Sequence, residues 1–265
     1  MRILRKYAFV VLLSARSNLV YMAEVLSRVV FLGLVLYIFS QLWHLVFKQC
    51  GAGRLGDLTL TQMIWYLTVT EAITLSAPRV AATVDLDVRS GALVTYLQRP
   101  LSYPLYSLAY NFGERAVRFA LNLAVGSVVA SCLVGLPTLS WQGATFFAVA
   151  VPFAFVVDFL ACFLIGLGAF WLEDTSGIFL IYSRINMILG GMLFPISLFP
   201  DALRRVVEWL PFAAITYGPA KLLVAPTDSE FVSVLLRQLL GMLAFGLLVA
   251  AVYNQASKRV FVNGG

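Results

Sequence analysis

The chain has 265 residues, of which 61% are hydrophobic and 12% are charged, and its mean hydropathy is +0.89. A water-soluble domain is usually about 45–50% apolar and about 25% charged, so this composition excludes a single soluble core and indicates that lipid covers the remaining apolar surface. The formal net charge of +6 argues against a nucleic-acid partner, because the basic residues lie mostly at the ends of apolar runs, where they orient a chain in a membrane.

The first predicted element is a basic amphipathic stretch over residues 1–24, which we expect to lie in the membrane plane as an interfacial helix. Six apolar runs follow, each long enough or nearly long enough to cross about 30 Å of hydrocarbon. They are Val25–Phe47, Thr59–Val80, Leu105–Val134, Trp141–Leu172, Ile178–Phe199 and Phe231–Tyr253. The sequence therefore predicts an all-α membrane protein with six transmembrane helices in a single domain over residues 1–265.

Lysine and arginine residues in the connecting segments set the expected orientation. With the N-terminus inside, the inner segments carry more of these residues than the outer ones, which is the bias of cytoplasmic loops. The inner set is Arg2, Arg5, Lys6, Arg16, Arg79, Arg89, Arg99, Lys258 and Arg259, and the outer set is Lys48, Arg54, Arg204, Arg205 and Lys221. We therefore expect a multi-pass protein of the cytoplasmic (inner) cell membrane with both termini in the cytoplasm.

The inner segment 81–103 combines apolar and polar residues at helical spacing around Gly91. The apolar stripe is Val88, Ala92, Leu93, Tyr96 and Leu97, and the opposite face carries Asp85, Asp87, Arg89 and Gln98. This pattern predicts one surface helix that ends before Pro100. Such a helix can dock into a groove on a partner or lie on the lipid surface, and the residues alone leave both open.

The outer segment 200–230 differs from an ordinary loop. A short amphipathic helix is expected from Asp201 to Leu210, closed by Pro211, because proline cannot continue a helix. Residues 212–223 are apolar but too short and broken to span, so we expect a re-entrant or interfacial element packed against the outer helix ends. In the preceding run, the Gly190-Gly191 pair predicts a kink.

Several charged residues fall inside the predicted spans, where each costs at least about 2.5–3.5 kcal/mol at the bilayer centre and should face protein or water. They are Glu71, Glu114, Arg115, Arg118, Asp158 and Arg184. We expect Asp158 to pair with Arg184 or with Arg118. Such charges can line a translocation path or form structural pairs that fix helix register, and both readings stay open.

Three strings, in order along the chain, resemble a known family. They are Gly91-Ala-Leu-Val-Thr-Tyr-Leu-Gln-Arg-Pro-Leu101, Phe170-Trp-Leu-Glu-Asp-Thr-Ser-Gly177 and Leu210-Pro-Phe-Ala-Ala-Ile-Thr-Tyr-Gly-Pro-Ala220. Their order and spacing are similar to those of type-2 ABC transporter permeases, which export drugs, lipids, polysaccharides and peptides. The resemblance implies two six-helix permease subunits, identical or homologous, and two cytosolic ABC ATPase subunits that drive them.

The resemblance also implies roles for particular residues. A short helix after the second span would couple the permease to the ATPase, with further contacts from the inner turn before the fifth span. The coupling residues would be Asp85, Asp87, Arg89, Gly91, Leu93, Leu97 and Arg99, together with Glu173 and Asp174. The residues implied for an outer gate are Pro211, Tyr217, Gly218 and Pro219.

Motifs for chemistry are missing from the sequence. It contains no G-x-x-x-x-G-K-[ST] string to hold phosphates and no HExxH string, so ATP and Mg²⁺ are expected on the partner ATPase and no cofactor on this chain. Three cysteines without a CxxC pair and a single histidine predict no metal site. We expect a transport subunit, without enzyme activity, for an amphipathic, lipid-like, drug-like, peptide or glycan cargo. The alternatives are an ion-coupled secondary transporter, which would need an internal repeat, and a membrane-embedded enzyme.

Overall fold

The computed structural model describes residues 2–18, 22–51, 53–98 and 101–263. Within these ranges all regular elements are helices, apart from an isolated bridge between Leu55 and Leu58. The α-helices are α1 (Arg2–Asn18), α2 (Met22–Cys50), α3 (Leu60–Leu75), α4 (Val80–Arg89), α5 (Ala92–Leu97), α6 (Tyr103–Val134), α7 (Trp141–Leu167), α8 (Ser176–Leu189), α9 (Asp201–Trp209), α10 (Pro211–Ile215), α11 (Tyr217–Val224) and α12 (Asp228–Asn263). Two 3₁₀ turns are η1 (Gly168–Phe170) and η2 (Ile196–Leu198). The all-α prediction is confirmed.

Four helices in the described ranges are long and apolar enough to cross a membrane, over Val30–Cys50, Tyr103–Val134, Trp141–Phe170 and Asp228–Ala256. They match the first, third, fourth and sixth predicted runs. The second and fifth runs form shorter helices than predicted. Helix α3 has 16 residues and α8 has 14, so the two helices extend about 24 and 21 Å at 1.5 Å per residue. The six-span count therefore depends on how the bilayer accommodates these two helices.

The breaks after α3 and α8 have local causes. The chain turns at Ser76–Arg79, where Pro78 separates α3 from α4, since proline lacks the amide hydrogen that a continuing helix needs. Helix α8 ends at Leu189 with Gly190 as its cap. The kink expected at Gly190-Gly191 is thus the end of the helix.

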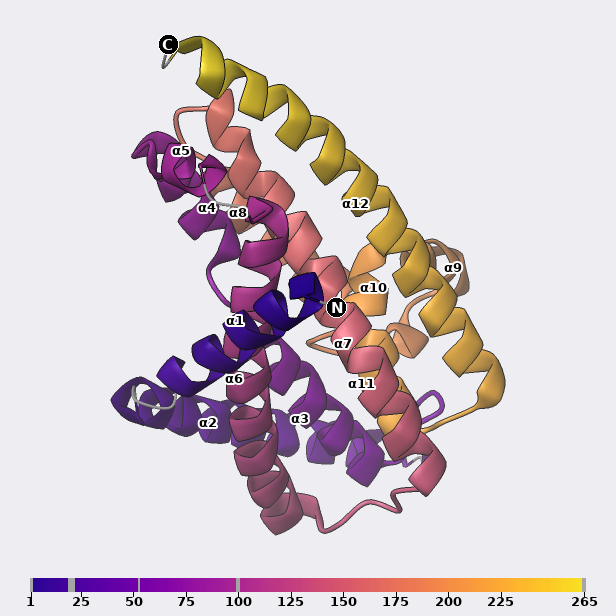
Figure 1. Cartoon of the computed structure of the whole chain (residues 1–265). Coiled ribbons are helices and arrows are strands. Elements are labelled where there is room, and N and C mark those ends of the chain that lie inside the picture. Colours follow the sequence, from indigo (N-terminus) through magenta and orange to yellow (C-terminus); the bar gives the residue numbers. More distant parts are fainter. Residues whose placement is uncertain (1, 19–21, 52, 99–100, 264–265) are drawn as a thin grey trace.

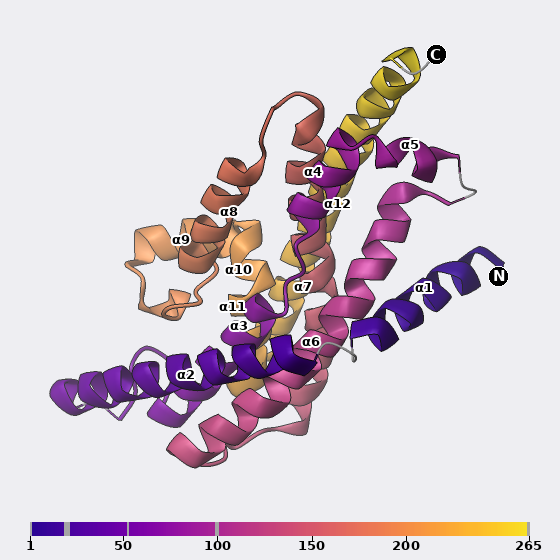
Figure 2. The ribbon, with the colours of Figure 1, turned by 90° about the vertical axis from the view of Figure 1, so that its left-hand side faces the viewer.

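The long helices α6, α7 and α12 run along the length of the molecule, and α2 crosses them near one end (Figure 1 and Figure 2). The end at the top of both views carries α4, α5, the turn between α7 and α8, and the C-terminal end of α12. The connection between α6 and α7, residues 135–140, lies at the opposite end. The first of these ends collects the inner segments predicted after the second span, after the fourth span and at the C-terminus, whereas α1 lies nearer the middle of the molecule.

Helix α3 is the centre of the main apolar core. All of its residues from Met63 to Ile73 are buried, and side chains of α2, α6, α7 and α11 pack around it. A second apolar cluster joins α4 and α5 to α6, α7 and α12. This second cluster supports the end of the molecule where the predicted coupling segment lies.

Helix α1 lies against α6 (Figure 2). The backbone N–H of Ser102 donates to the Tyr7 hydroxyl at 3.2 Å, while Phe9, Leu12 and Leu13 are exposed. An exposed apolar face on a basic helix is typical of helices that lie in a membrane interface.

The outer segment is a series of three short helices, α9 to α11. Helix α9 ends at Trp209, two residues before Pro211, as the pattern predicted. The chain from Ala213 to Val224 is buried against α3, α7 and α12. Helices α10 and α11 are therefore part of the helix bundle, whereas α9 lies on its surface, with only Val207 buried.

Candidate functional site

The predicted coupling segment forms two helices, α4 and α5, with a sharp bend at Gly91; we call this pair the elbow. The expectation of one continuous surface helix is wrong. Gly91 has φ +72°, a left-handed conformation that glycine adopts without steric cost, and helical periodicity gave no sign of this bend.

The apolar stripe of the elbow packs inside its own chain. Leu93 is 2% exposed and belongs to the second apolar cluster, and Val88 and Tyr96 pack against that cluster. The large apolar side chains that the elbow exposes, among its described residues, are Leu86 (65%) and Val94 (43%). A partner on this surface would therefore meet Leu86 and Val94 and not Leu93; the Leu97 side chain and Arg99 lie outside the described residues.

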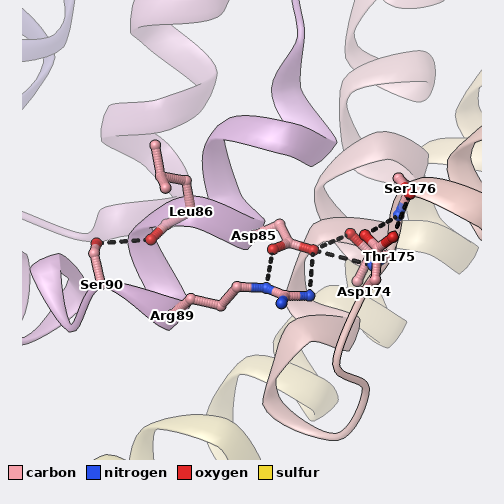
Figure 3. A network of polar contacts seen from close by, with 7 residues as sticks. All are labelled: Asp85, Leu86, Arg89, Ser90, Asp174, Thr175 and Ser176. Carbon is pink, nitrogen blue, oxygen red and sulfur yellow. Dashed lines mark hydrogen bonds and ion pairs between the residues drawn. The ribbon is translucent and has the colours of Figure 1, made fainter.

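Asp85 ties the elbow to the turn between α7 and α8 (Figure 3). Its carboxylate accepts hydrogen bonds from the Arg89 guanidinium and the Thr175 hydroxyl, and from the backbone N–H of Thr175 at 3.1 Å. Burial would raise the pKa of the Asp85 carboxyl, but the hydrogen bonds from Thr175 and Arg89 outweigh it and hold the pKa below its usual value. The ionised carboxylate therefore stabilises this contact.

The neighbouring turn is itself ordered by Asp174, which accepts from the Ser176 backbone N–H at 2.9 Å and from its hydroxyl at 2.5 Å. These hydrogen bonds from Ser176 lower the pKa of the Asp174 carboxyl. An aspartate that accepts from the backbone N–H two residues further along forms an Asx turn, which orders the chain just before α8. Glu173 is exposed beside it, so both acidic residues lie on the surface next to the elbow.

Two further contacts hold the elbow to the long helices. The Tyr103 hydroxyl at the start of α6 donates to Asp87 at 2.8 Å. Helix α4 also lies so close to α7 that a Cβ on Gly166 would stand 2.6 Å from the Val84 Cβ, a distance that real side chains do not tolerate. The elbow is thus attached to α6, to α7 and to the beginning of α8.

A buried ion pair lies deeper in the bundle. Arg115 Nη1 of α6 is 2.7 Å from Asp158 Oδ2 of α7, and the Tyr182 hydroxyl of α8 donates to Asp158 Oδ1 at 2.7 Å. Arg115 Nη2 also donates to the Ile73 carbonyl at the end of α3, at 3.4 Å. Four helices therefore meet at Arg115 and Asp158.

The predicted partners of Asp158 were wrong. Arg118 pairs with Glu114 within α6 at 2.5 Å, and Arg184 is exposed on α8. Residues 115 and 118 differ by about 60° around a helix of 3.6 residues per turn, and the buried face of α6 is the one that carries Ser107, Asn111 and Arg115. The sixth predicted charge, Glu71, is buried in α3.

A cavity of about 280 Å³ adjoins this ion pair, between the α3–α4 connection and helices α6, α7, α8 and α10. Arg79, Arg115, Asp158, Tyr182, Asn186 and Thr216 are among the residues that line it. Sequence reasoning missed Tyr182, Asn186 and Thr216, because one hydroxyl or amide in an apolar helix carries no signal of what it faces.

The residues implied for an outer gate lie within the buried outer segment. Tyr217, Gly218 and Pro219 are buried and Pro211 is partly buried. Tyr217 meets Tyr66 of α3 edge-on, with ring centroids 6.0 Å apart, and the Tyr66 hydroxyl donates to the Gly191 carbonyl. These contacts fasten the outer segment to the central helix.

No group of three or more histidine, cysteine, aspartate or glutamate side chains that could hold a metal occurs in the part of the chain that the structure describes. A search among curated proteins finds no match. The family model described as ABC-2 family transporter protein matches residues 10–264, nearly the whole chain, which confirms the resemblance carried by the three strings. The chain belongs to the ABC-2 family of transporters and is a type-2 ABC permease.

Proposed function

We propose that this chain is the permease subunit of an ATP-driven exporter in the cytoplasmic membrane, powered by two cytosolic ABC ATPase subunits. Membership of the ABC-2 family supports transport over an enzyme activity. The sequence has no phosphate-binding motif of its own, so hydrolysis of ATP with Mg²⁺ takes place on another chain. Both termini are cytoplasmic in this proposal, on the side of the elbow.

The observation that carries the proposal is the way in which the elbow is built. Its inner face is fixed to the bundle by the second apolar cluster, by Asp85 with Thr175, and by Tyr103 with Asp87. Its outer face presents Leu86 and Val94. Closely packed elements move together, so a partner that displaces the elbow also displaces α6, α7 and the start of α8.

The exposed surface of the elbow has the chemistry of a docking site. Two exposed apolar side chains, Leu86 and Val94, are accompanied by charged residues at Arg89, Glu173 and Asp174. An apolar centre with a polar rim is the usual anatomy of a protein interface. We assign this surface to the ATPase.

Helix α8 supports pairing with a second permease subunit, identical or homologous. None of its residues is buried, and its open surface carries Arg184 among apolar side chains such as Ile181 and Ile185. An arginine in a membrane helix faces protein or water and avoids lipid. We therefore propose that a second subunit covers α8. We also propose that the cargo belongs to the class that the family exports, which is amphipathic, lipid-like, drug-like, peptide or glycan.

The test is ATP hydrolysis that depends on the elbow. The tagged full-length chain is purified in mild detergent from the cells in which it operates, and ATP hydrolysis in the eluate is measured. The variant Leu86→Asp/Val94→Asp should reduce the co-purifying activity at least about tenfold, since burying each apolar side chain contributes about 1.5–3 kcal/mol and about 1.4 kcal/mol is tenfold in affinity.

The matched control is Leu136→Asp, which changes an exposed leucine in the connection at the opposite end of the molecule. It should leave the co-purifying hydrolysis unchanged. Hydrolysis that is absent from the unmodified preparation, or that both variants retain in full, would refute the assignment of the elbow to an ATPase.

A further inference from the structure

We infer that the cavity beside Arg115 and Asp158 binds the anionic headgroup of a single-chain amphiphile, one that carries a phosphate or a carboxylate. The inference rests on the proposed transport function, because it names the class of cargo that would enter the bundle. The proposed binding site lies within one subunit, between α8 and the α3–α4 connection.

Three of the residues that line the cavity each carry a buried polar atom that has no partner within the described structure. Arg115 Nε and Thr216 Oγ1 are both buried without a hydrogen bond, and so is Asn186 Oδ1. Arg115 is 3% exposed and Thr216 is 1% exposed. A buried polar atom without a partner costs about 1–3 kcal/mol, so three of them around one cavity indicate that a polar group is accommodated there.

The balance of donors and charges selects an anion. Asp158 has both carboxylate oxygens engaged, one with Arg115 and one with Tyr182, and so offers little to a cation. Arg115 Nε and the Thr216 hydroxyl can donate, and the exposed Arg79 adds a positive charge at the cavity wall. The charged lining therefore consists of two arginines and one aspartate. Guanidinium groups bind phosphate and carboxylate well.

The remaining lining and the size of the cavity select an amphiphile. Ile73, Phe179, Met187 and Ile215 form apolar parts of the wall. A volume of about 280 Å³ exceeds by far the roughly 10–15 Å³ that one water occupies on this measure. Helix α8, which forms one wall, has no buried residue, so an alkyl chain can extend from the cavity along its apolar surface.

The experiment uses the full chain in nanodiscs of zwitterionic phosphatidylcholine, titrated with dodecyl phosphate, with native mass spectrometry to count the molecules retained. One bound dodecyl phosphate per chain is expected. Dodecanol and dodecyltrimethylammonium, which share the alkyl chain but not the negative charge, should bind at least about tenfold more weakly, about 1.4 kcal/mol. Inorganic phosphate should compete poorly, because it lacks the chain.

Two variants test the lining. Thr216→Val keeps the shape of the side chain and removes the unpartnered hydroxyl, so thermal stability should be unchanged or slightly higher while dodecyl phosphate binds several-fold more weakly. Arg79→Gln should weaken binding about tenfold. Arg54→Gln, which removes an exposed arginine remote in sequence from the lining residues, is the matched control and should have no effect.

Equal retention of all three amphiphiles, with no effect of Thr216→Val or Arg79→Gln, would overturn the site. Binding of inorganic phosphate as tight as that of dodecyl phosphate would overturn the amphiphile class. The proposed function is tested separately by the hydrolysis assay. Amphiphile binding without a co-purifying ATPase would support the binding site and refute the proposed function. A co-purifying ATPase without amphiphile binding would refute only the binding site.

Discussion

Helices α3 and α8 are both short and equally apolar, but they have opposite surroundings. In α3, with 16 residues, all side chains from Met63 to Ile73 are buried. In α8, with 14 residues, none is buried. Apolarity therefore indicates that a helix avoids water, but it does not reveal what covers the helix. The protein itself covers α3, whereas α8 is left to lipid or to a second subunit.

Arg115 and Asp158 connect these two helices. Arg115 donates to the Ile73 carbonyl at the end of α3, and Asp158 accepts from Tyr182 of α8. Helix α8 has few other contacts with the bundle, mainly with α4, α7 and α10. The position of α8 thus depends on a small number of polar contacts, while that of α3 depends on apolar packing. Three predictions test this difference.

The largest effect is expected from Arg115→Ala. It leaves the Asp158 carboxylate buried without its cation, and breaking a buried ion pair in this way costs about 3–5 kcal/mol. The measurement is thermal or denaturant-induced unfolding of the purified protein in detergent, followed by the accessibility of Cys162, which is buried beside Asp158.

The control for this prediction is Arg118→Ala on the same helix. Arg118 and Glu114 are partly exposed, and partly exposed pairs contribute about 1 kcal/mol or less. Equal losses for the two variants would mean that the pair with Asp158 has no special role in holding α3 and α8 together.

The second prediction compares the two helices directly, with Leu67→Ala in α3 and Ile181→Ala in α8. Leu67 is 1% exposed and Ile181 is 62% exposed. Truncating a buried leucine costs about 2–5 kcal/mol, whereas truncation at an exposed position usually changes stability by no more than about 0.5 kcal/mol. The same unfolding measurement should rank them in this order. A large loss for Ile181→Ala in a preparation of single subunits would contradict the open surface of α8.

Hydropathy and local stop signals predicted much of this fold. The four long spans and the end of α9 before Pro211 follow from apolar runs and proline, which act locally. At Gly190, where a kink was expected, the glycine ends α8. The family also follows from local strings. The coupling role of the elbow, the outer gate, the orientation in the membrane and the partner chains stay predictions.

Two of the failures share a different cause, which is orientation around a helix axis. Which of Arg115 and Arg118 meets Asp158 depends on how α6 is rotated against α7, and both arginines lie on one side of the same helix. The stripe through Leu93 was correctly identified as apolar, but an apolar stripe fits the protein's own core as well as it fits a partner. Tertiary packing decides both questions, and a single sequence does not contain it in readable form.

The smallest effect concerns Asp85. This residue lies on α4, the helix that follows α3 in the chain, and its side chain connects α4 to the turn before α8. Asp85→Asn should cost about 1 kcal/mol at pH 7, since it weakens charge-assisted hydrogen bonds at a partly exposed site.

The pH dependence of this effect follows from the pKa of the Asp85 carboxyl, which is lowered from 3.8 in the folded protein. The contribution of Asp85 to stability is therefore complete above pH 3.8 and is lost as the pH falls through the pKa of the folded state. The stability difference between wild type and Asp85→Asn should therefore be the same at pH 7 and pH 5 and shrink below pH 3.8. Since the other carboxyl groups titrate in both proteins, a difference that persists at the lowest pH would show that the Asp85 contact does not depend on its ionisation.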